Sequence, residues 1–379
     1  MSVDNFNGKL PPEFSDLSGV KNVVFPEKLS RPVKGYDFNT CGASVDFDRL
    51  LSEFTLSTGL QSTYFARALE EIHRMISAKL DSKLTPGDLK KQQEIPIDDW
   101  KPTPCTIFLS YTSNLITAGT REIIRYLVQH KMVDCLVSTG GGIEEDFVKC
   151  LAPTMVGEFE LSGKDLLGLG VNRNGNLLLS DGVYGRFEKW IIPLLDKMLL
   201  EEKEGLVSWT PSKLIRRLGK EINNEQSVYY WAYKNNIPVF SPGITDGAIG
   251  DYLFLHSFKH EGKTITLDVA SDVRALMMTA IRSSKTAALC LGAGLPKHHV
   301  LNANAWRLGV DYCVYINTAQ EFDGCDSGAL PEEAVSWGKI KPEANAVKLF
   351  SEVSVVLPLI VSQTFFKRQE EFNDSLCAE

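Results

Sequence analysis

Short, mostly apolar runs alternate with helical periodicity through most of this chain, and this alternation constrains the fold more than any other feature. Cys105–Tyr111 has the length of a buried strand, and Leu115–His130 has apolar residues at helical spacing. Strands without a polar face are buried on both sides. The pattern therefore predicts an α/β fold: one large, doubly wound, mostly parallel sheet with helices on both faces. Further strands are predicted at Val133–Ser138, Pro238–Ser241, Ala287–Gly292, Tyr312–Asn317 and Val347–Ser351, and further helices at Gln61–Leu80, from Ile143, at Tyr184–Glu202, Pro211–Leu218, Gln226–Lys234 and Val273–Arg282, from about Lys297, and at Pro358–Phe372.

Two segments lack this periodicity. Residues 1–40 are rich in Pro, Gly, Ser and Asp and predict an N-terminal arm with at most a short helix. Ser82–Pro104 is polar and proline-rich, which indicates a surface connection. Residues 41–379 are expected to form a single domain, because large α/β enzymes often do.

The composition is that of an ordinary globular protein, with 44% hydrophobic and 23% charged residues among 379. A formal charge of −8 argues against nucleic-acid binding and is compatible with a cationic substrate or a basic partner. We find neither a secretory leader nor an apolar run near the ~18 residues of a membrane span. The eight cysteines are scattered without a CxxC pair. This usage predicts a cytoplasmic protein with no disulfide and no metal site.

Glycine, small residues and hydroxyls recur where the predicted strands end. Sheets of this kind bind ligands beyond the carboxyl ends of their strands. Small residues there let the backbone approach a ligand, so the composition is typical of a nucleotide crevice, although the usual GxGxxG fingerprint is absent. The strand ends are Ser113-Asn114, Thr139-Gly140-Gly141-Gly142, Thr245-Asp246-Gly247, Gly292-Ala293-Gly294 and Asn317-Thr318-Ala319.

Three acids, Glu144, Glu145 and Asp146, follow the triple glycine. A glycine turn that leads into a helix can hold a phosphate, but three carboxylates beside it would repel one. Ribose hydroxyls or an ammonium group fit better. The acids could instead only complement the helix dipole at about 0.3–1 kcal/mol each, and the sequence leaves both readings open. Near Thr245, Asp246 and Asp251 favour a capped tight turn, with ligand binding as the alternative.

The segment Ile316–Ile340 is the most informative for function. It combines five carboxylates with Trp337 and Lys339, a set that suits a ligand with several positive charges. Solvated ion pairs contribute only about 0–1 kcal/mol, whereas charges about 4 Å apart in a partly buried site interact by about 4 kcal/mol. Strong binding therefore requires an enclosed site. The carboxylates are Glu321, Asp323, Asp326, Glu332 and Glu333.

Lys339 is the candidate nucleophile of this segment. A lysine attacks a carbonyl or imine only when deprotonated, and desolvation or a nearby cation favours that form. Trp337 could hold an ammonium group against its face for about 0.5–2 kcal/mol, or it could simply pack in the core. His298 is more often a structural residue at a helix start, but it could shuttle protons if it faces the crevice.

From Gly35 to near Phe372 the chain resembles the deoxyhypusine synthase family. The resemblance rests on long motifs: TSNLI at Thr112–Ile116, RYLVQHKMVD at Arg125–Asp134, LGKEINN at Leu218–Asn224, and the Ile316–Ile340 segment. It implies a single Rossmann-like domain that binds NAD, assembled as a homotetramer with active sites between subunits. It also implies transfer of the aminobutyl group of spermidine, through an imine on Lys339, to one lysine of the eukaryotic translation initiation factor 5A precursor, with NAD accepting and returning a hydride.

The motifs also imply roles for individual residues. Lys339 corresponds to the nucleophile, and His298 to a polyamine-contacting residue that assists proton transfer. The other polyamine contacts would be Glu144, Glu145, Asp251, Asn302, Gly324, Asp326, Glu333 and Trp337. The NAD contacts would be Ser113, Asn114, Thr117, Thr139, Gly140, Gly141, Asp246, Ala293, Thr318, Ala319, Ser327, Glu352 and Val353.

The chain departs from the family pattern at a few positions, and two other functions compete with the first. Ala293 stands in place of a glycine, Cys325 of a serine, Leu330 of an arginine, and Glu352-Val353 of an Asp-Ala pair. We expect NAD affinity to be most sensitive to these changes. Homospermidine synthases resemble the same family and use putrescine as the acceptor. A non-catalytic regulatory paralogue is the third reading, which the presence of Lys339 disfavours.

Overall fold

The computed structural model describes residues 33–41, 44–80 and 104–377, and it divides the chain into two compact units at Ser62. In the first unit, the 3₁₀ helix η4 (Phe38–Thr40) precedes α1 (Phe47–Ser57). The interpretations of residues 1–32 as an arm and of residues 82–103 as a surface connection lie outside the described residues. Where the domain begins therefore stays a prediction.

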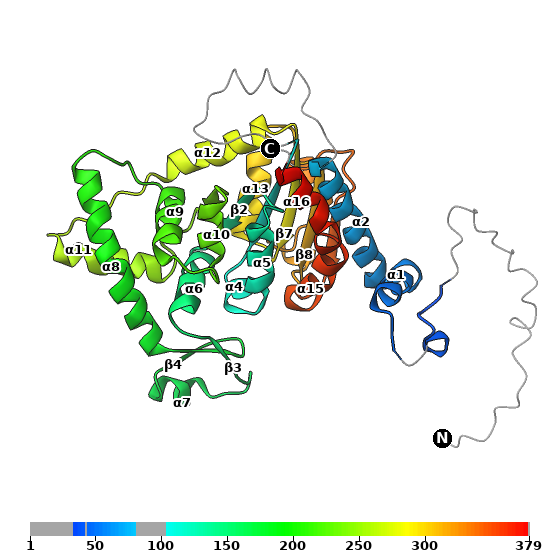
Figure 1. The fold of residues 1–379 in the computed structure, drawn as a ribbon, viewed down its shortest axis with the longest axis horizontal. Helices are drawn as coiled ribbons and strands as arrows, with labels where there is room; N and C mark the ends of the chain where they lie inside the picture. Colours follow the sequence, from blue (N-terminus) through cyan, green and yellow to red (C-terminus); the bar gives the residue numbers. More distant parts are fainter. Residues whose placement is uncertain (1–32, 42–43, 81–103, 378–379) are drawn as a thin grey trace, which may run out of the picture. The chain divides into compact units, whose positions relative to one another are not determined.

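The second unit is built on a six-stranded parallel sheet, as predicted (Figure 1). Each neighbouring pair of strands is parallel. The predicted strand positions are confirmed to within about two residues. In sheet order the strands are β6 (Val239–Phe240), β2 (Cys135–Ser138), β1 (Cys105–Tyr111), β7 (Lys285–Leu291), β8 (Tyr312–Asn317) and β9 (Val347–Phe350).

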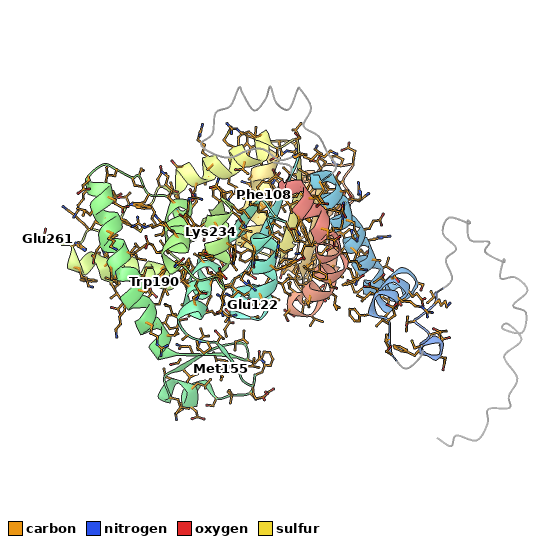
Figure 2. The ribbon with its side chains drawn as sticks, viewed as in Figure 1. Phe108, Glu122, Met155, Trp190, Lys234 and Glu261 are labelled. Atoms are coloured by element: carbon orange, nitrogen blue, oxygen red, sulfur yellow. The ribbon has the colours of Figure 1, made fainter. Side chains whose placement is uncertain are left out.

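Both faces of this sheet are covered, which explains why its strands have no polar side. In β1, Ile107 and Leu109 point into one apolar core, and Phe108 points into the other. In β8, Val314 and Tyr315 divide in the same way. Figure 2 labels Phe108 within the sheet. Core residues come on the first face from α2 (Leu60–Leu80), α5 (Thr120–Gln129) and α15 (Val353–Gln363), and on the second from α12 (Val269–Arg282), α13 (Leu295–Ala305) and α14 (Pro331–Ser336).

The predicted helix Leu115–His130 is wrong in its continuity, because it is two helices, α4 (Asn114–Thr117) and α5. The chain is extended at Ala118, where ψ is 176°. The ammonium of Lys149 donates hydrogen bonds to the carbonyls of Ile116, Thr117 and Ala118 at 3.0–3.1 Å. This side chain satisfies carbonyls that a continuous helix would have used.

The helix predicted from Ile143 begins earlier, at Gly140, and forms α6 (Gly140–Leu151). The side chain of Thr139 caps it by accepting a hydrogen bond from the Gly142 N–H at 3.3 Å. The glycines are therefore helical residues that allow close packing. A side-chain carbon on Gly142 would lie 2.1 Å from Oγ of Ser138.

The predicted helix Pro358–Phe372 is also wrong in its bounds. The structure has α15, the 3₁₀ helix η6 (Phe366–Arg368) and α16 (Gln369–Cys377). The helix α15 begins before Pro358, at Val353. The side chain of Glu352 caps it there by accepting a hydrogen bond from the Val355 N–H at 3.2 Å, so Pro358 lies inside the helix. The helices α8 (Asp181–Lys203), α9 (Pro211–Ile222) and α10 (Val228–Lys234) agree with their predictions apart from their ends.

Several elements were not predicted. Between α6 and α8, the chain forms a three-stranded antiparallel sheet in the order β3-β5-β4, with α7 (Gly163–Gly168) between β3 and β4 in the sequence. Figure 2 labels Met155 on β3. Its strands are short and largely exposed, so they lack a clear apolar period. Two further elements are α11 (Ala248–Lys259) and the 3₁₀ helix η5 (Glu321–Asp323), and the small strands are β3 (Met155–Val156), β4 (Val171–Asn174) and β5 (Leu177–Ser180).

The order of the parallel strands creates a topological switch between β1 and β7. From β1 the chain builds outward through β2 to β6, and from β7 it builds the other way to β9. Ligand crevices in such sheets form beyond the carboxyl ends of the strands at this switch. None of the helices within the described ranges is long and apolar enough to cross a membrane.

Candidate active site

Lys339 lies in a turn whose backbone is fixed on two sides. After α14 ends, the N–H of Lys339 donates to the carbonyl of Ala334 at 2.9 Å. The N–H of Val310 donates to the carbonyl of Lys339 at 3.0 Å, and Val310 pairs with Ile340 as a parallel bridge. Gly309, with φ of +100°, allows this close approach, because a side-chain carbon there would lie 2.6 Å from the carbonyl carbon of Ile340. The position of the Lys339 backbone is therefore well defined.

The side chain of Lys339 contacts the two residues that the sequence associated with it. Its Nζ lies 3.1 Å from Nε2 of His298 and 5.6 Å from the centroid of the Trp337 ring. Trp337 is 69% exposed, so its reading as a core residue is wrong. Burial, and then the charge of Lys339, lowers the pKa of His298. The neutral imidazole that this shift favours can accept a hydrogen bond from Nζ of Lys339 at its Nε2.

Lys297, which the sequence reading passed over as a functional residue, organises the neighbouring loop. Its side chain is 2% exposed, and its Nζ lies 3.4 Å from Oδ2 of Asp326 and 4.9 Å from the centroid of the Tyr315 ring. It also donates to the carbonyl oxygen of Asp326. A buried lysine is held by charge and hydrogen bonds, so Lys297 fixes Asp326 close to the helix turn that carries His298. Its position directly after the β7 loop, where ligands bind in such sheets, could have identified Lys297 as a candidate from the sequence.

The acids of the Ile316–Ile340 segment are open to solvent in this single chain. Asp326 is 41% exposed at its side chain, and Phe322 beside them is 86% exposed. Asn302 is half-buried on α13, and Gly324 ends η5 with φ of +74°. The described residues do not enclose these groups, so the enclosed site expected from the sequence stays a prediction. The exposed acids are Glu321, Asp323, Asp326, Glu332 and Glu333.

Two of the three acids in α6 stabilise other helices. Glu144 is buried, and its carboxylate accepts from the Ile249 N–H at 2.8 Å, so it caps the first turn of α11. Asp146 is fully buried in an ion pair with Arg121 at 2.7 Å, and it accepts from the Val228 N–H at 3.1 Å at the start of α10. The helix-dipole reading is thus too simple, because the acids serve neighbouring helices rather than their own.

Glu145 is the acid of this set that is available to a ligand. Its Oε2 is buried without a hydrogen-bond partner among the described residues, and its Oε1 lies 3.5 Å from the Tyr184 hydroxyl. Burial, and then the charge of Glu144, raises the pKa of Glu145 to about 7. A buried carboxylate oxygen without a donor is unfavourable. An ammonium group would supply both the donor and the charge. Asp251, also in the polyamine set, is exposed in the first turn of α11.

Residues of the NAD set meet at the carboxyl edge of β1 and β2. A side-chain carbon on Gly141 would lie 3.0 Å from Cβ of Ser113. One on Gly140 would lie 3.0 Å from the carbonyl oxygen of Asp246. The loops after β1, β2 and β6 therefore converge, as the strand ends predicted, and the glycines allow their backbones to pack closely.

A second group of the NAD set lies beyond β7 and β8. A side-chain carbon on Gly294 would lie 3.7 Å from Oγ of Ser327. The N–H of Ala319 donates to Oδ1 of Asn317 at 3.1 Å, and Lys348 donates to the carbonyl of Ala319 at 2.8 Å. Lys348, which is 4% exposed and which the sequence analysis did not single out, fixes this loop from β9. Ala293 is half-buried here, and Thr318 is exposed.

Other members of the NAD set have structural contacts within the chain. Thr117 is buried, and its hydroxyl donates to the carbonyl of Ser113 at 3.3 Å. Asn114 accepts from the Thr112 hydroxyl at 2.6 Å. Glu352 caps α15 and Val353 packs in the core. Their contacts with NAD stay predictions.

The predicted residues thus fall into three places: the group around Lys339, the buried oxygen of Glu145, and the carboxyl edge of the large sheet. Lys339, His298 and Trp337 are in contact, with Asp326 nearby through Lys297. Across the part of the chain that the structure describes, no hydrogen bond or ion pair joins Glu145 to Lys339. The arrangement places a candidate nucleophile, a candidate base and an aromatic face together, and a candidate ligand acid with a buried oxygen elsewhere.

Comparisons with known proteins point to one enzyme family. The family model for deoxyhypusine synthase matches residues 49–364. The chain is 50% identical to a Dictyostelium discoideum protein named "Probable deoxyhypusine synthase", over 97% of this chain and 95% of that one. It is 49% identical to the deoxyhypusine synthase of Senecio vernalis, over 94% of this chain and 96% of that one. A crystal structure from Entamoeba histolytica that bears the same enzyme name has a TM-score of 0.61 at 30% identity, over 88% and 96%.

Proposed function

Because this chain belongs to the deoxyhypusine synthase family, we propose that it transfers the 4-aminobutyl group of spermidine to one lysine of the eukaryotic translation initiation factor 5A precursor. The observation that carries this proposal is the contact of 3.1 Å between Nζ of Lys339 and Nε2 of His298, next to the Trp337 face. A lysine with a neutral base at hydrogen-bond distance can become a free amine. It is then a nucleophile for an imine carbon.

The steps that fall to this chain are proton transfers and one exchange of amines. Spermidine first loses a hydride and a proton and becomes an imine. His298 accepts a proton from Lys339, and the freed Nζ adds to the imine carbon. The bond from that carbon to 1,3-diaminopropane then breaks, and a proton goes to the leaving amine. The aminobutyl group stays on Lys339 as an imine until the acceptor lysine attacks in the same way.

NAD fits the carboxyl edge of the sheet and would supply the hydride acceptor and donor. The support is the strand switch between β1 and β7, where such sheets bind dinucleotides, with Ser113 following β1 and Gly141 packed closely against it from the end of β2. The loops with Asp246 and with Ser327 would hold its polar groups. The side chain of Ala293 adds a methyl group at this edge, which would lower the affinity for NAD.

The polyamine would be held by charge and by an aromatic face. Trp337 can accept an ammonium against its ring, and Asp326 lies near His298 through Lys297. Glu145 offers a buried oxygen without a donor. These groups would bind the separate amines of one extended trication.

A homotetramer with active sites between subunits would explain the open site. Trp337 and Phe322 expose large apolar surfaces beside the acids. A second chain over them would remove water and strengthen every charge interaction with the polyamine. The cytoplasmic location stays a prediction.

Incubation of the purified chain with NAD, the factor precursor, putrescine and spermidine labelled in its aminobutyl group tests the function. The proposal predicts label on a lysine of the factor. Label in homospermidine instead would identify putrescine as the acceptor. No transfer by the chain alone, with activity restored by a partner subunit, would support the regulatory paralogue and refute the proposal.

A further inference from the structure

Three side chains that commonly bind metals gather where α8 packs against α11, away from the groups discussed so far. They are Asp196 of α8, His256 of α11 and His260, the residue that caps the carboxyl end of α11. One ligand atom from each lies within 4.8 Å of the others. Figure 1 shows the two helices side by side, and Figure 2 labels Glu261, the residue after His260.

The geometry of the three ligand atoms is close to that of a metal site. Oδ1 of Asp196 lies 3.1 Å from Nε2 of His256 and 2.7 Å from Nε2 of His260. The histidines are four residues apart, one in the last turn of α11 and one at its C-cap, which is the sequence spacing of known zinc-binding pairs. Zinc bonds of about 2.0–2.1 Å in a tetrahedron place neighbouring ligand atoms roughly 3.3 Å apart. A small outward rotation of the side chains would therefore admit an ion.

The surroundings also favour a metal. Nδ1 of His256 lies 3.1 Å from the hydroxyl of Thr264, which can accept its proton and leave Nε2 free to bind, as second-shell partners of metal-bound histidines do. Asp196 is 45% exposed at its side chain and leaves an entry path from solvent.

We propose that Asp196, His256 and His260 bind one divalent transition-metal ion, with Zn²⁺ as the probe, through Oδ1 and the two Nε2 atoms. Solvent completes the coordination. Two imidazoles select against Mg²⁺ and Ca²⁺, which prefer oxygen ligands. The ion fastens the end of α11 to α8. The absence of cysteine pairs, which predicted no metal site, does not bear on this set because no cysteine takes part.

The competing state is a hydrogen-bonded triad without metal. In it, each Nε2–H donates to Asp196, and the Thr264 hydroxyl donates to Nδ1 of His256. Both states use the same side chains, so a measurement of metal binding separates them.

The test is a zinc titration of the full chain without an affinity tag, stripped of metal and in competition with a chromophoric chelator. All variants carry Cys325→Ser, because this exposed thiol could bind zinc. The proposal predicts one zinc per chain. His260→Asn should weaken binding at least about tenfold, the lower limit for loss of a supporting partner. His130→Asn is the matched control, because His130 caps α5 as His260 caps α11 and is likewise partly exposed.

A second readout guards against misfolded variants. Zinc should raise the unfolding temperature of the parent and of His130→Asn, but not of His260→Asn, whose metal-free unfolding should match the parent. Co²⁺ should give the absorption bands of a four-coordinate site in the parent and in His130→Asn, but not in His260→Asn. Zinc binding that is absent from the parent, or equal in parent and His260→Asn, overturns the proposal and leaves the hydrogen-bonded triad. The titration contains neither NAD nor spermidine, so its outcome is independent of the proposed transferase activity.

Discussion

Glu144 and Glu145 are neighbours in α6, yet the carboxylate of Glu144 caps α11 through the Ile249 N–H at 2.8 Å, while Oε2 of Glu145 is buried without a partner among the residues described. Adjacent side chains on a helix point about 100° apart. One therefore turns to the start of α11 and the other to the Tyr184 hydroxyl. Two adjacent glutamates in the sequence thus have different roles: Glu144 is structural, and Glu145 is a candidate ligand.

Glu145→Gln should weaken spermidine binding and leave the fold intact. A hydrogen bond to a charged group contributes about 1.5–3 kcal/mol, so KM for spermidine should rise about 10- to 100-fold. In the parent, KM should also rise as the pH falls through about 7, the pKa of Glu145, because protonation removes its charge. Steady-state kinetics at roughly pH 6 to 8, about one unit on either side of that pKa, measure the KM of the variant and the pH dependence of the parent KM. A pH-independent KM in the parent would contradict the assignment.

Glu145→Gln and Glu144→Gln should change the stability of the protein in opposite directions. The pKa of Glu145 is raised on folding, so its contribution to stability is greatest at low pH and is lost as the pH rises toward about 7. Glu145→Gln should thus unfold at the same or a higher temperature than the parent at pH 8. Glu144→Gln, the matched control, weakens a helix cap and should lower stability by about 0.5–2 kcal/mol. Thermal unfolding without ligands measures both.

His298→Ala should lower kcat about 10²-fold, the smaller end of the range for loss of a general base. The pKa of His298 is below its usual 6.5. Imidazolium cannot accept a proton, so the transfer rate of the parent should fall only when the pH drops below that value, and the variant should lack this fall. His299→Gln is the control, because His299 faces a separate pocket beside Pro211 and Phe240. An acid limb that survives in His298→Ala would assign it to another group.

Most of the large sheet could be predicted because burial on both faces favours apolar residues on both sides of a strand. Phe108 and Leu109 point to opposite cores, and either would be polar if one face met water. The small antiparallel sheet has no such constraint, because Met155 and Val156 are 59% and 79% exposed. The start of α11 was read as a turn, since its cap comes from Glu144, more than a hundred residues earlier in the chain.

The site shows the same division between local and distant information. Trp337 and Lys339 lie two residues apart, so the sequence alone predicted that they act together. The position of His298 after the β7 loop likewise made it a candidate for the crevice. The roles of Lys297 and Lys348 depend on carbonyls 29 residues away in each case. The pairing of Asp196 with His256 and His260 joins two helices about 60 residues apart, which no local motif reveals.

Lys339→Arg should abolish transfer as completely as Lys339→Ala. An arginine keeps a cation over the Trp337 ring but does not deprotonate in proteins, so only the nucleophile is lost. Loss of a nucleophile should reduce kcat at least about 10³-fold. Lys341→Arg is the matched control, because an arginine there can retain the ion pair with Asp311. Transfer of labelled aminobutyl groups is the measurement, and appreciable transfer by Lys339→Arg would remove Lys339 as the nucleophile.

Gly309→Ala should impair catalysis without removing any chemical group. Its side-chain carbon would lie 2.6 Å from the carbonyl carbon of Ile340, so the segment that carries Lys339 must move away from Val310. A shift of about 1 Å at a reacting group can cost about 10²-fold, so kcat should fall by at least about tenfold with a smaller change in KM. Gly205→Ala is the control for backbone strain, because φ there is +73° and no atom lies within 4 Å of the added carbon. Both variants should lose stability at their left-handed positions, but only Gly309→Ala should lose turnover at a temperature where both remain folded. Parental kcat in folded Gly309→Ala would mean that the pairing of Val310 with Ile340 does not position the amine.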